Sequence, residues 1–192
     1  MSITGVILAG GQGRRMGGID KGLVEFLGKP LISHIIQRLS PQVSEILISA
    51  NREIETYSAL GHPVVTDAVQ GFAGPLAGLH KGMMEARYPY VLTVPCDTPL
   101  ISMSLAGRLM QGLTNCDADV AVAKTGMQPH PVFCLCRRTL LPHLEDYLQH
   151  GGRKFEDWYS SLDSVEILFN DQPQAFTNIN TREELLCLEQ AA

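Results

Sequence analysis

The sequence predicts an α/β protein whose mostly parallel sheet is covered by helices on both faces, a three-layer αβα arrangement. Short β-branched runs alternate with segments whose apolar residues recur at helical spacing, which is the pattern of repeated βαβ units. Composition agrees, because 45% of the 192 residues are hydrophobic and 18% are charged, as in a globular chain that buries a core. No repeat, low-complexity segment or linker interrupts this pattern, so residues 1–192 are interpreted as one domain.

The first half of the chain is expected to contain strands that alternate with helices. Each strand is a short run rich in valine and isoleucine, and the first of them ends in glycine. Pro30 and Pro75 each follow a glycine-containing turn and suit the first turn of a helix, and Gly61 suits a helix end. The expected strands are residues 3–10, 44–51, 62–68 and 90–99, and the expected helices are residues 28–40, 52–60 and 74–88.

The second half continues the same alternation. Ser102 is expected to cap a helix, and Thr181 with Glu184 forms the Thr-x-x-Glu pattern of a capping box at the start of the last helix. The expected strands are residues 118–125, 130–138 and 164–169, and the expected helices are residues 102–113, 139–152, 153–162 and 181–190.

Polar features follow each of the first four predicted strands. A basic, glycine-rich loop follows the first strand, Asn51 the second, Asp67 the third and Asp97 the fourth. Ligands of such sheets bind beyond the carboxyl ends of the strands. These features are therefore expected to gather at one edge of the sheet and to form the ligand site there.

Charge and cysteine content exclude several classes of protein. A net charge of -5 argues against a nucleic-acid partner, although local basic groups can still hold a small anion. No signal-like segment or apolar run of about 18 residues is present, so no membrane role is expected. The five cysteines are odd in number and include no CxxC pair, which indicates reduced thiols and a cytoplasmic location. Cys134 and Cys136 share one face of a strand and are interpreted as core residues.

The loop after the first strand has the composition of a phosphate-binding loop. Glycines let successive backbone N–H groups approach an anion, while arginine and lysine add charge and hydrogen-bond donors. A flexible loop with solvated arginines is the alternative interpretation. The residues concerned are Gly10, Gly11, Gly13, Gly17 and Gly18 with Arg14, Arg15 and Lys21.

Two familiar phosphate-binding motifs do not match this loop. Gly13 and Gly18 have the spacing of a Walker A loop, but Ile19 stands where that motif needs lysine. Met16 breaks the third glycine position of the dinucleotide fingerprint, and the residue after Gly17 is another glycine instead of a helix start.

The stretch "LAGGQGRRMGGIDKG", residues 8–22, resembles the N-terminal signature of the nucleotidyltransferases that activate sugars and cofactors. The segments "VPCDTPLI" and "FTNINTREEL" narrow the resemblance to the molybdenum cofactor guanylyltransferases. Further segments resemble that family in its own order, and together they cover nearly the whole chain: "SANR", "VTDA", "GPLAGL" and "PHPVF".

The resemblance implies a Rossmann-like nucleotidyltransferase fold and the transfer of GMP from GTP to the terminal phosphate of molybdopterin. Pyrophosphate leaves, Mg²⁺ is the expected cofactor, and no protein nucleophile is needed. Arg15 and Lys21 are the candidates to neutralise phosphate charge, and Asp97 is the catalytic carboxylate and the metal ligand. The N-terminal half would then be the GTP side and the C-terminal half the molybdopterin side.

The same resemblance implies two sets of binding residues. Backbone of the first set faces guanine, ribose and phosphates, although many relatives carry serine where this chain has Gly13. The expected GTP-binding residues are Leu8, Ala9, Gly10, Gly11, Gly13, Lys21, Asn51, Asp67 and Asp97. The expected molybdopterin-binding residues are Gly74, Pro75, Leu76, Gly78, His130, Asn178 and Asn180.

Structural alternatives stand beside several of these roles. Asp97 can turn the chain or cap the next helix, Asp67 can end its strand in an Asx turn, and Asn51 can cap a helix that starts at Arg52. Asn178 and Asn180 can belong to a plain turn, and His130 can be a loop or core residue.

Alternatives also remain open for the activity. A relative that uses CTP or a sugar phosphate would share the loop, and a molybdopterin or nucleotide carrier would bind without turnover. Transient contacts with proteins that make molybdopterin and with molybdoenzyme chaperones are expected from the family.

Overall fold

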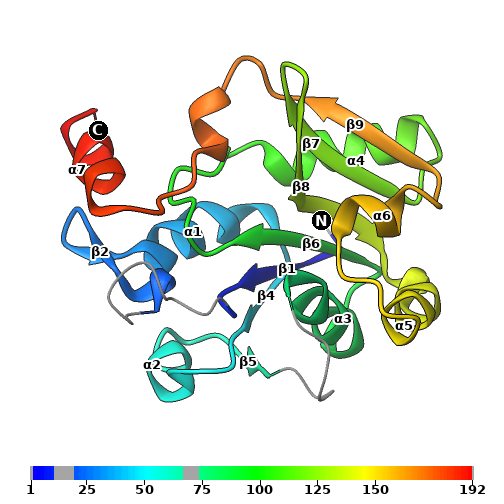
Figure 1. Cartoon of the computed structure of the whole chain (residues 1–192), viewed down its shortest axis with the longest axis horizontal. Coiled ribbons are helices and arrows are strands. Elements are labelled where there is room, and N and C mark those ends of the chain that lie inside the picture. The colour runs from blue at the N-terminus through cyan, green and yellow to red at the C-terminus, as the bar shows by residue number, and fades with distance from the viewer. Residues whose placement is uncertain (1, 11–19, 67–73, 192) are drawn as a thin grey trace.

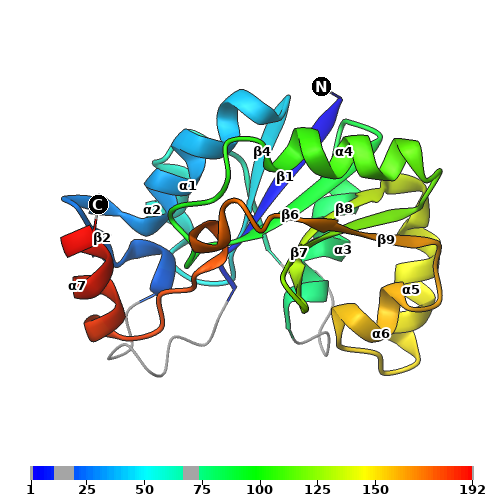
Figure 2. The same cartoon turned by 90° about the horizontal axis from the view of Figure 1, so that it is seen from above.

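The computed structural model describes residues 2–10, 20–66 and 74–191 of the chain. Its centre is a seven-stranded sheet with the strand order β5-β4-β1-β6-β8-β7-β9 (Figures 1 and 2). The strands are β1 (Ile3–Leu8), β4 (Glu45–Ser49), β5 (Val64–Val65), β6 (Tyr90–Pro95), β7 (Val120–Thr125), β8 (Gln128–Arg137) and β9 (Ser164–Leu168).

The predicted fold class is confirmed, with one strand that departs from the simple alternation. β1 pairs in parallel with β4 and β6, β4 with β5, and β7 with β9. β8 is antiparallel to both β6 and β7. Only Gly126 and Met127 separate β7 from β8, and a connection this short returns the chain antiparallel to itself. Gly126 has a φ of +54°, which favours glycine at this turn.

Helices cover both faces of the sheet (Figure 2). α1 and α4 pack on the face that includes Ile3 and Ile7 of β1, while α3, α5 and α6 pack on the face that includes Val6 and Leu8. Side chains of a strand alternate between faces, so one strand contributes to both cores. The helices are α1 (Leu31–Leu39), α2 (Ile54–Ser58), α3 (Pro75–Glu85), α4 (Leu105–Asn115), α5 (Leu141–Gln149), α6 (Phe155–Tyr159) and α7 (Arg182–Ala191). Short 3-10 turns are η1 (Lys21–Leu23), η2 (Ser40–Gln42), η3 (Arg138–Leu140) and η4 (Pro173–Phe176).

A small third core joins the two ends of the chain. A hairpin of β2 (Glu25–Phe26) and β3 (Lys29–Pro30), which sequence reasoning did not predict, lies beside α7 (Figure 1). Phe26, Leu31 and Ile179 are buried together, and Leu185 and Leu188 of α7 pack against them. The C-terminal helix is thereby attached to the segment that follows the glycine-rich loop.

Two candidate N-cap residues lie two positions before the observed ones. Ser104, not Ser102, precedes α4, and the Ser102 hydroxyl instead accepts a hydrogen bond from the Ser104 backbone N–H at 3.2 Å. α2 begins at Ile54 with Glu53 as its N-cap residue, so Asn51 does not cap this helix. Cys134 and Cys136 are both fully buried in the core on the α3 side, as predicted.

Candidate active site

The carboxyl ends of β1, β4 and β6 meet at one edge of the sheet. The Ala9 N–H donates to the Ser49 carbonyl at 2.8 Å, and the Cys96 N–H donates to the Leu8 carbonyl at 3.1 Å. A methyl group placed on Gly10 would lie 3.7 Å from the Asn51 amide nitrogen. The residues just beyond these three strands are therefore neighbours.

Several predicted site residues lie outside the described residues. These are Gly11, Gly13 and Arg15 of the glycine-rich loop, and Asp67 after β5. The two ends of the loop are described, and they are Gly10, two residues after β1, and Asp20, directly before η1.

Lys21 joins three distant parts of the chain. Its Nζ donates to the Asp97 Oδ2 at 3.1 Å and to the Asn180 Oδ1 at 2.6 Å. The Lys21 and Asp97 side chains are 25% and 14% exposed, so the ion pair is partly shielded but still open to a ligand. A cation from the start of the chain thus lies between the carboxylate after β6 and an amide near the C-terminus.

The segment 178–180 is fixed along the turn that carries Asp97. The Thr98 hydroxyl donates to the Asn178 Oδ1 at 2.7 Å, and the Ile179 N–H donates to the Asp97 carbonyl at 2.9 Å. Asn180 in turn accepts from Lys21. Both asparagines therefore use their amide oxygens inside the protein, and their NH₂ groups are the part that can donate to a ligand.

The predicted capping box holds this segment at the start of α7. The Glu184 carboxylate accepts from the N–H groups of Asn180 at 2.6 Å and Thr181 at 3.0 Å, and the Thr181 hydroxyl accepts from the Glu184 N–H at 3.1 Å. The hydrogen bond from the Asn180 N–H is the main reason that the pKa of Glu184 lies below its ordinary value. The Glu184 carboxylate therefore both caps α7 and fixes the backbone of Asn180.

Asp20 and Tyr57 form a second contact beneath Lys21, which sequence reasoning missed. The buried Tyr57 hydroxyl donates to Asp20 Oδ1, and the same oxygen accepts from the Gly22 N–H at 3.2 Å. Burial raises the pKa of the Asp20 carboxyl. The two residues are 37 positions apart in the sequence, so no local sequence pattern predicts their contact.

The predicted molybdopterin-side residues at the start of α3 divide into two kinds. Gly74 and Pro75 are exposed, and Gly74 has a φ of +103°, which favours glycine there. Leu76 and Gly78 are buried, and a methyl group on Gly78 would lie 2.6 Å from the Leu8 side chain. Leu76 and Gly78 thus pack between helix and sheet, and only the exposed pair lies at the surface.

His130 lies near the start of β8. Its ring stacks on Phe176 with 4.6 Å between centroids, and its Nε2 lies 2.7 Å from the Thr125 hydroxyl. Burial lowers its pKa, which favours the neutral ring at pH 7. Phe176 stands two residues before Asn178, so His130 contacts the segment that leads into the site.

The donor set around Asp97 suits a hard cation that arrives with phosphates. Within the described ranges, no group of three or more His, Cys, Asp or Glu side chains is arranged to hold a metal ion by itself. Mg²⁺, however, is commonly bound through one or two carboxylates together with water and substrate phosphates. Asp97 is a partly exposed carboxylate at the ligand edge and therefore fits this mode.

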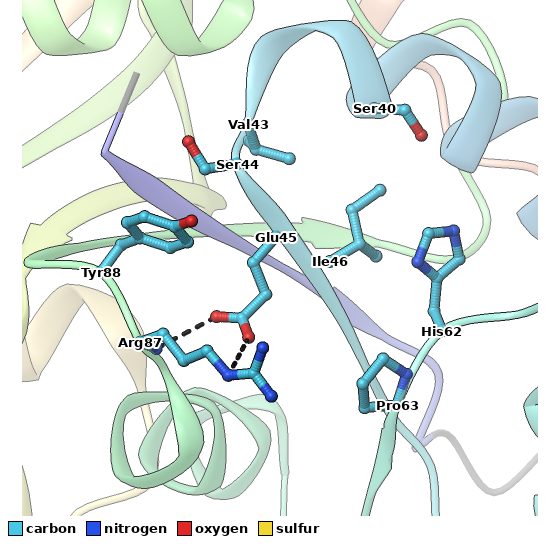
Figure 3. A pocket seen from close by; sticks show the side chains of 9 residues that line it. All are labelled: Ser40, Val43, Ser44, Glu45, Ile46, His62, Pro63, Arg87 and Tyr88. Atoms are coloured by element: carbon cyan, nitrogen blue, oxygen red, sulfur yellow. Dashed lines mark hydrogen bonds and ion pairs between the residues drawn. The ribbon is translucent and has the colours of Figure 1, made fainter.

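A hollow lies at the opposite, amino-terminal end of the strands (Figure 3). Its acidic residue is Glu45, whose carboxylate accepts from the Thr4 hydroxyl at 2.7 Å and from the Arg87 N–H at 3.0 Å. The Arg87 Nε also lies 3.4 Å from this carboxylate. These contacts join β1, β4 and the segment before β6, so Glu45 has a structural role and the candidate site stays at the carboxyl edge.

Fold and site together define a nucleotidyltransferase, and the comparisons with known proteins agree. The family model described as "MobA-like NTP transferase domain" matches residues 5–165. A molybdenum cofactor guanylyltransferase of Ralstonia nicotianae is 48% identical over 95% of this chain and 94% of its own length. One of Shewanella piezotolerans is 44% identical over 100% of this chain and 94% of its own length. The chain belongs to the molybdenum cofactor guanylyltransferase family.

Solved structures share the fold. The molybdopterin-guanine dinucleotide biosynthesis protein A of Archaeoglobus fulgidus superposes with a TM-score of 0.81 at 22% identity, covering 98% of this chain and 97% of its own.

Among the described residues, no helix has the length and apolar character needed to cross a membrane.

Proposed function

We propose that this protein transfers GMP from GTP to the terminal phosphate of molybdopterin, giving molybdopterin guanine dinucleotide and pyrophosphate. Family membership supports the reaction. The observation that carries the assignment to this site is the position of Lys21 between Asp97 and Asn180. The Lys21 ammonium group contacts Asp97, which is proposed for the GTP side, and Asn180, which is proposed for the molybdopterin side.

Charge repulsion is the main obstacle to this reaction. A phosphate oxygen of one anion attacks the α-phosphorus of another, and negative charge builds up on the leaving pyrophosphate. A positioned cation stabilises such charge without a protein nucleophile. We propose that Lys21 Nζ is this cation and that Arg15 adds a second one from the loop.

Asp97 is the residue that would hold Mg²⁺. When bound, the metal would neutralise phosphate charge and orient the triphosphate. Asp97 already contacts Lys21 through Oδ2, so the carboxylate keeps the lysine and the metal side of the site together.

The remaining binding roles follow the arrangement at the sheet edge. Backbone at the end of β1 and the neighbouring Asn51 are proposed to contact the nucleotide, and the NH₂ groups of Asn178 and Asn180 to contact the pterin. The further proposed GTP contacts are Leu8, Ala9, Gly10, Gly11, Gly13 and Asp67, and the further proposed molybdopterin contacts are Gly74, Pro75 and His130. Leu76 and Gly78 are buried between α3 and the sheet, so no direct ligand contact is proposed for them.

Residues 1–192 are proposed to act as one domain, with the GTP side in the N-terminal half and the molybdopterin side in the C-terminal half. We also propose a cytoplasmic location, because the five cysteines suit a reducing compartment. Molybdopterin would pass to and from the site through transient contacts with the proteins that make it and with molybdoenzyme chaperones.

Turnover with separate nucleotides tests the proposal. Purified protein is incubated with molybdopterin, Mg²⁺ and either GTP or CTP, and pyrophosphate and the dinucleotide product are measured. We expect product with GTP and a loss on the order of 10²–10³ in rate for Lys21→Ala, the usual effect of removing one such donor. Lys81→Ala, which removes a similarly part-buried lysine paired with Glu85 on α3, is the matched control and should stay within about twofold of the wild type.

Each other outcome points to a different protein. Product with CTP in place of GTP would make the chain a cytidylyltransferase. Binding of GTP and molybdopterin without release of pyrophosphate would make it a carrier.

A further inference from the structure

Tyr57 is a buried polar residue that the proposed chemistry does not use. It lies on α2, its exposed fraction is 0%, and it belongs to the core that includes α1 and α4. A buried tyrosine hydroxyl normally needs a hydrogen-bond partner. Here the partner is the Asp20 carboxylate, which stands directly before Lys21.

Asp20 links Tyr57 to the turn that carries Lys21. η1 begins at Lys21, and Asp20 is its N-cap residue, with a side chain that accepts from the Gly22 N–H at 3.2 Å. The same Oδ1 accepts from Tyr57 and from Gly22. The hydroxyl on α2 thus fixes the carboxylate that caps η1.

Gly22 lies close both to the Tyr57 hydroxyl and to Cys96, the residue before Asp97. A methyl group on Gly22 would lie 2.6 Å from the Tyr57 hydroxyl oxygen and 3.3 Å from the Cys96 Cβ. Cys96 is buried and directly precedes Asp97. Tyr57, Gly22 and Cys96 therefore pack together below the Lys21–Asp97 ion pair.

Lysine has a long side chain with many rotamers, and an exposed lysine samples most of them. Its ammonium group helps a reaction only when it is already at the place where charge develops. Contacts to Asp97 and Asn180 hold the end of the Lys21 side chain, and the Tyr57–Asp20 contact holds its backbone. Both ends must be fixed for one preferred position.

We infer that Tyr57 is a positioning residue for the proposed guanylyl transfer, which acts through Asp20 to place Lys21. This inference rests on the proposed function of the site. Tyr57 itself is buried in the core, so it would touch neither nucleotide nor molybdopterin. Its contribution should therefore depend entirely on the presence of the Lys21 ammonium group.

Tyr57→Phe removes the hydroxyl and keeps the ring that fills the core. We expect kcat to fall about tenfold with a smaller change in KM for GTP, since a misplaced group that acts in the transition state lowers kcat. In a Lys21→Ala background the same change should cost less than about twofold, because effects that share one group are not additive. Tyr90→Phe, at the start of β6 and packed against the same core, is the matched control and should retain wild-type kcat.

A second measurement is independent of turnover. Acylation of each lysine by a soluble active ester is followed by peptide mass spectrometry in the absence of substrates. Lys21 should react several-fold faster in Tyr57→Phe than in the wild type, whereas exposed Lys29 in β3 should react at the same rate in both.

Two results would overturn the inference. One is an equal loss of kcat for Tyr57→Phe in the wild-type and Lys21→Ala backgrounds, which indicates general damage to the core. The other is an unchanged Lys21 acylation rate, which decides the matter even if no nucleotide is turned over. Failure of the proposed function is distinct from both, because it appears as a wild-type protein that releases no pyrophosphate.

Discussion

The Asp97 carboxylate contacts Lys21 and is also the proposed metal ligand. Its Oδ2 accepts from Lys21, and its backbone carbonyl accepts from the Ile179 N–H. An asparagine at this position can keep the contact with Lys21 through its amide oxygen, but it carries no charge for a divalent cation. The contact with Lys21 and the proposed metal role can therefore be separated by one substitution.

Asp97→Asn should keep the fold and lose activity. We expect rate losses on the order of 10²–10³ for the loss of one electrostatic contact of this kind, with an increased Mg²⁺ requirement. The measurement is the rate of pyrophosphate release as Mg²⁺ is titrated, with circular dichroism as the check on folding. Asp119→Asn is a suitable control because Asp119 pairs with Arg137 away from this edge. A variant that retained wild-type rate at low Mg²⁺ would remove Asp97 from the metal role.

Sequence reasoning reached some of these residues and missed others for a physical reason. Asp97 and Asn51 were predicted to approach the first loop because each follows a parallel strand, and topology alone brings such ends together. Asp20 and Tyr57 meet only because α2 packs below η1, and no spacing in the sequence encodes that contact. The hydrogen bond from Lys21 to Asn180 depends likewise on where the last helix packs.

The elements at the two ends of the chain act together at this site. α7 packs on the β2–β3 hairpin through Phe26, Ile179 and Leu185, and the Leu27 N–H donates to Glu189 at 3.2 Å. The hairpin itself was not predicted, because its strands are two residues long and show no alternation that a sequence pattern could reveal. The antiparallel direction of β8 was also missed, although the two-residue turn at Gly126 was a signal for it.

Loss of the N-cap of α7 should affect stability and activity together. Thr181→Ala removes a hydroxyl that accepts from the Glu184 N–H, and such caps contribute about 1 kcal/mol. Asn180 precedes this cap and contacts Lys21, so we also expect reduced guanylyl transfer. Urea unfolding and pyrophosphate release measure the two effects. Thr114→Ala, in the last turn of α4, is the control for loss of a helix threonine elsewhere.

Glu184 should make the stability of this region depend on pH. Its pKa is lowered from 4.5 in the folded chain, so its contribution is fully present above the unfolded value and is lost as pH falls through the folded value. The difference in unfolding free energy between wild type and Glu184→Gln should therefore be largest near pH 7 and should close in acid. Glu183→Gln removes the same charge but leaves the hydrogen bond from Asn180 to Glu184 in place. A gap that did not narrow on acidification would contradict this account of the pKa.

At the scale of the whole molecule, the distance between α3 and the sheet sets the geometry of the ligand edge. Gly78 and Gly82 lie one turn apart on the face of α3 that meets β1. A methyl group on Gly82 would lie 2.6 Å from the Val6 side chain, and one on Gly78 would lie 2.6 Å from Leu8 and 2.7 Å from the Ser49 hydroxyl. Val6 is fully buried and β-branched, so it has little freedom to move aside.

Alanine at either glycine should push the helix layer from the sheet, but only one should alter catalysis strongly. Overpacking of a core costs about 1–3 kcal/mol of folding free energy. This cost equals or exceeds the roughly 1 kcal/mol that alanine gains over glycine in a helix. Both variants should therefore unfold at lower urea concentration. Gly78 contacts Leu8 and Ser49, the last residues of β1 and β4 at the ligand edge, so Gly78→Ala should also lower guanylyl transfer. Gly82→Ala, farther from that edge, should retain most of it.

A compensating substitution tests the physical cause. Val6→Ala removes the methyl groups that the new Gly82→Ala side chain would meet, so the double variant should be more stable than the sum of the single effects by about 1 kcal/mol or more. The same Val6→Ala change should give no such relief to Gly78→Ala, whose neighbours are Leu8 and Ser49. The unfolding free energies of the wild type, the three single variants and the two double variants complete both double-mutant cycles. Absence of relief for Gly82→Ala would mean that the contact with Val6 does not govern this position. Equal losses of activity for the two glycine variants would separate Gly78 from the ligand edge.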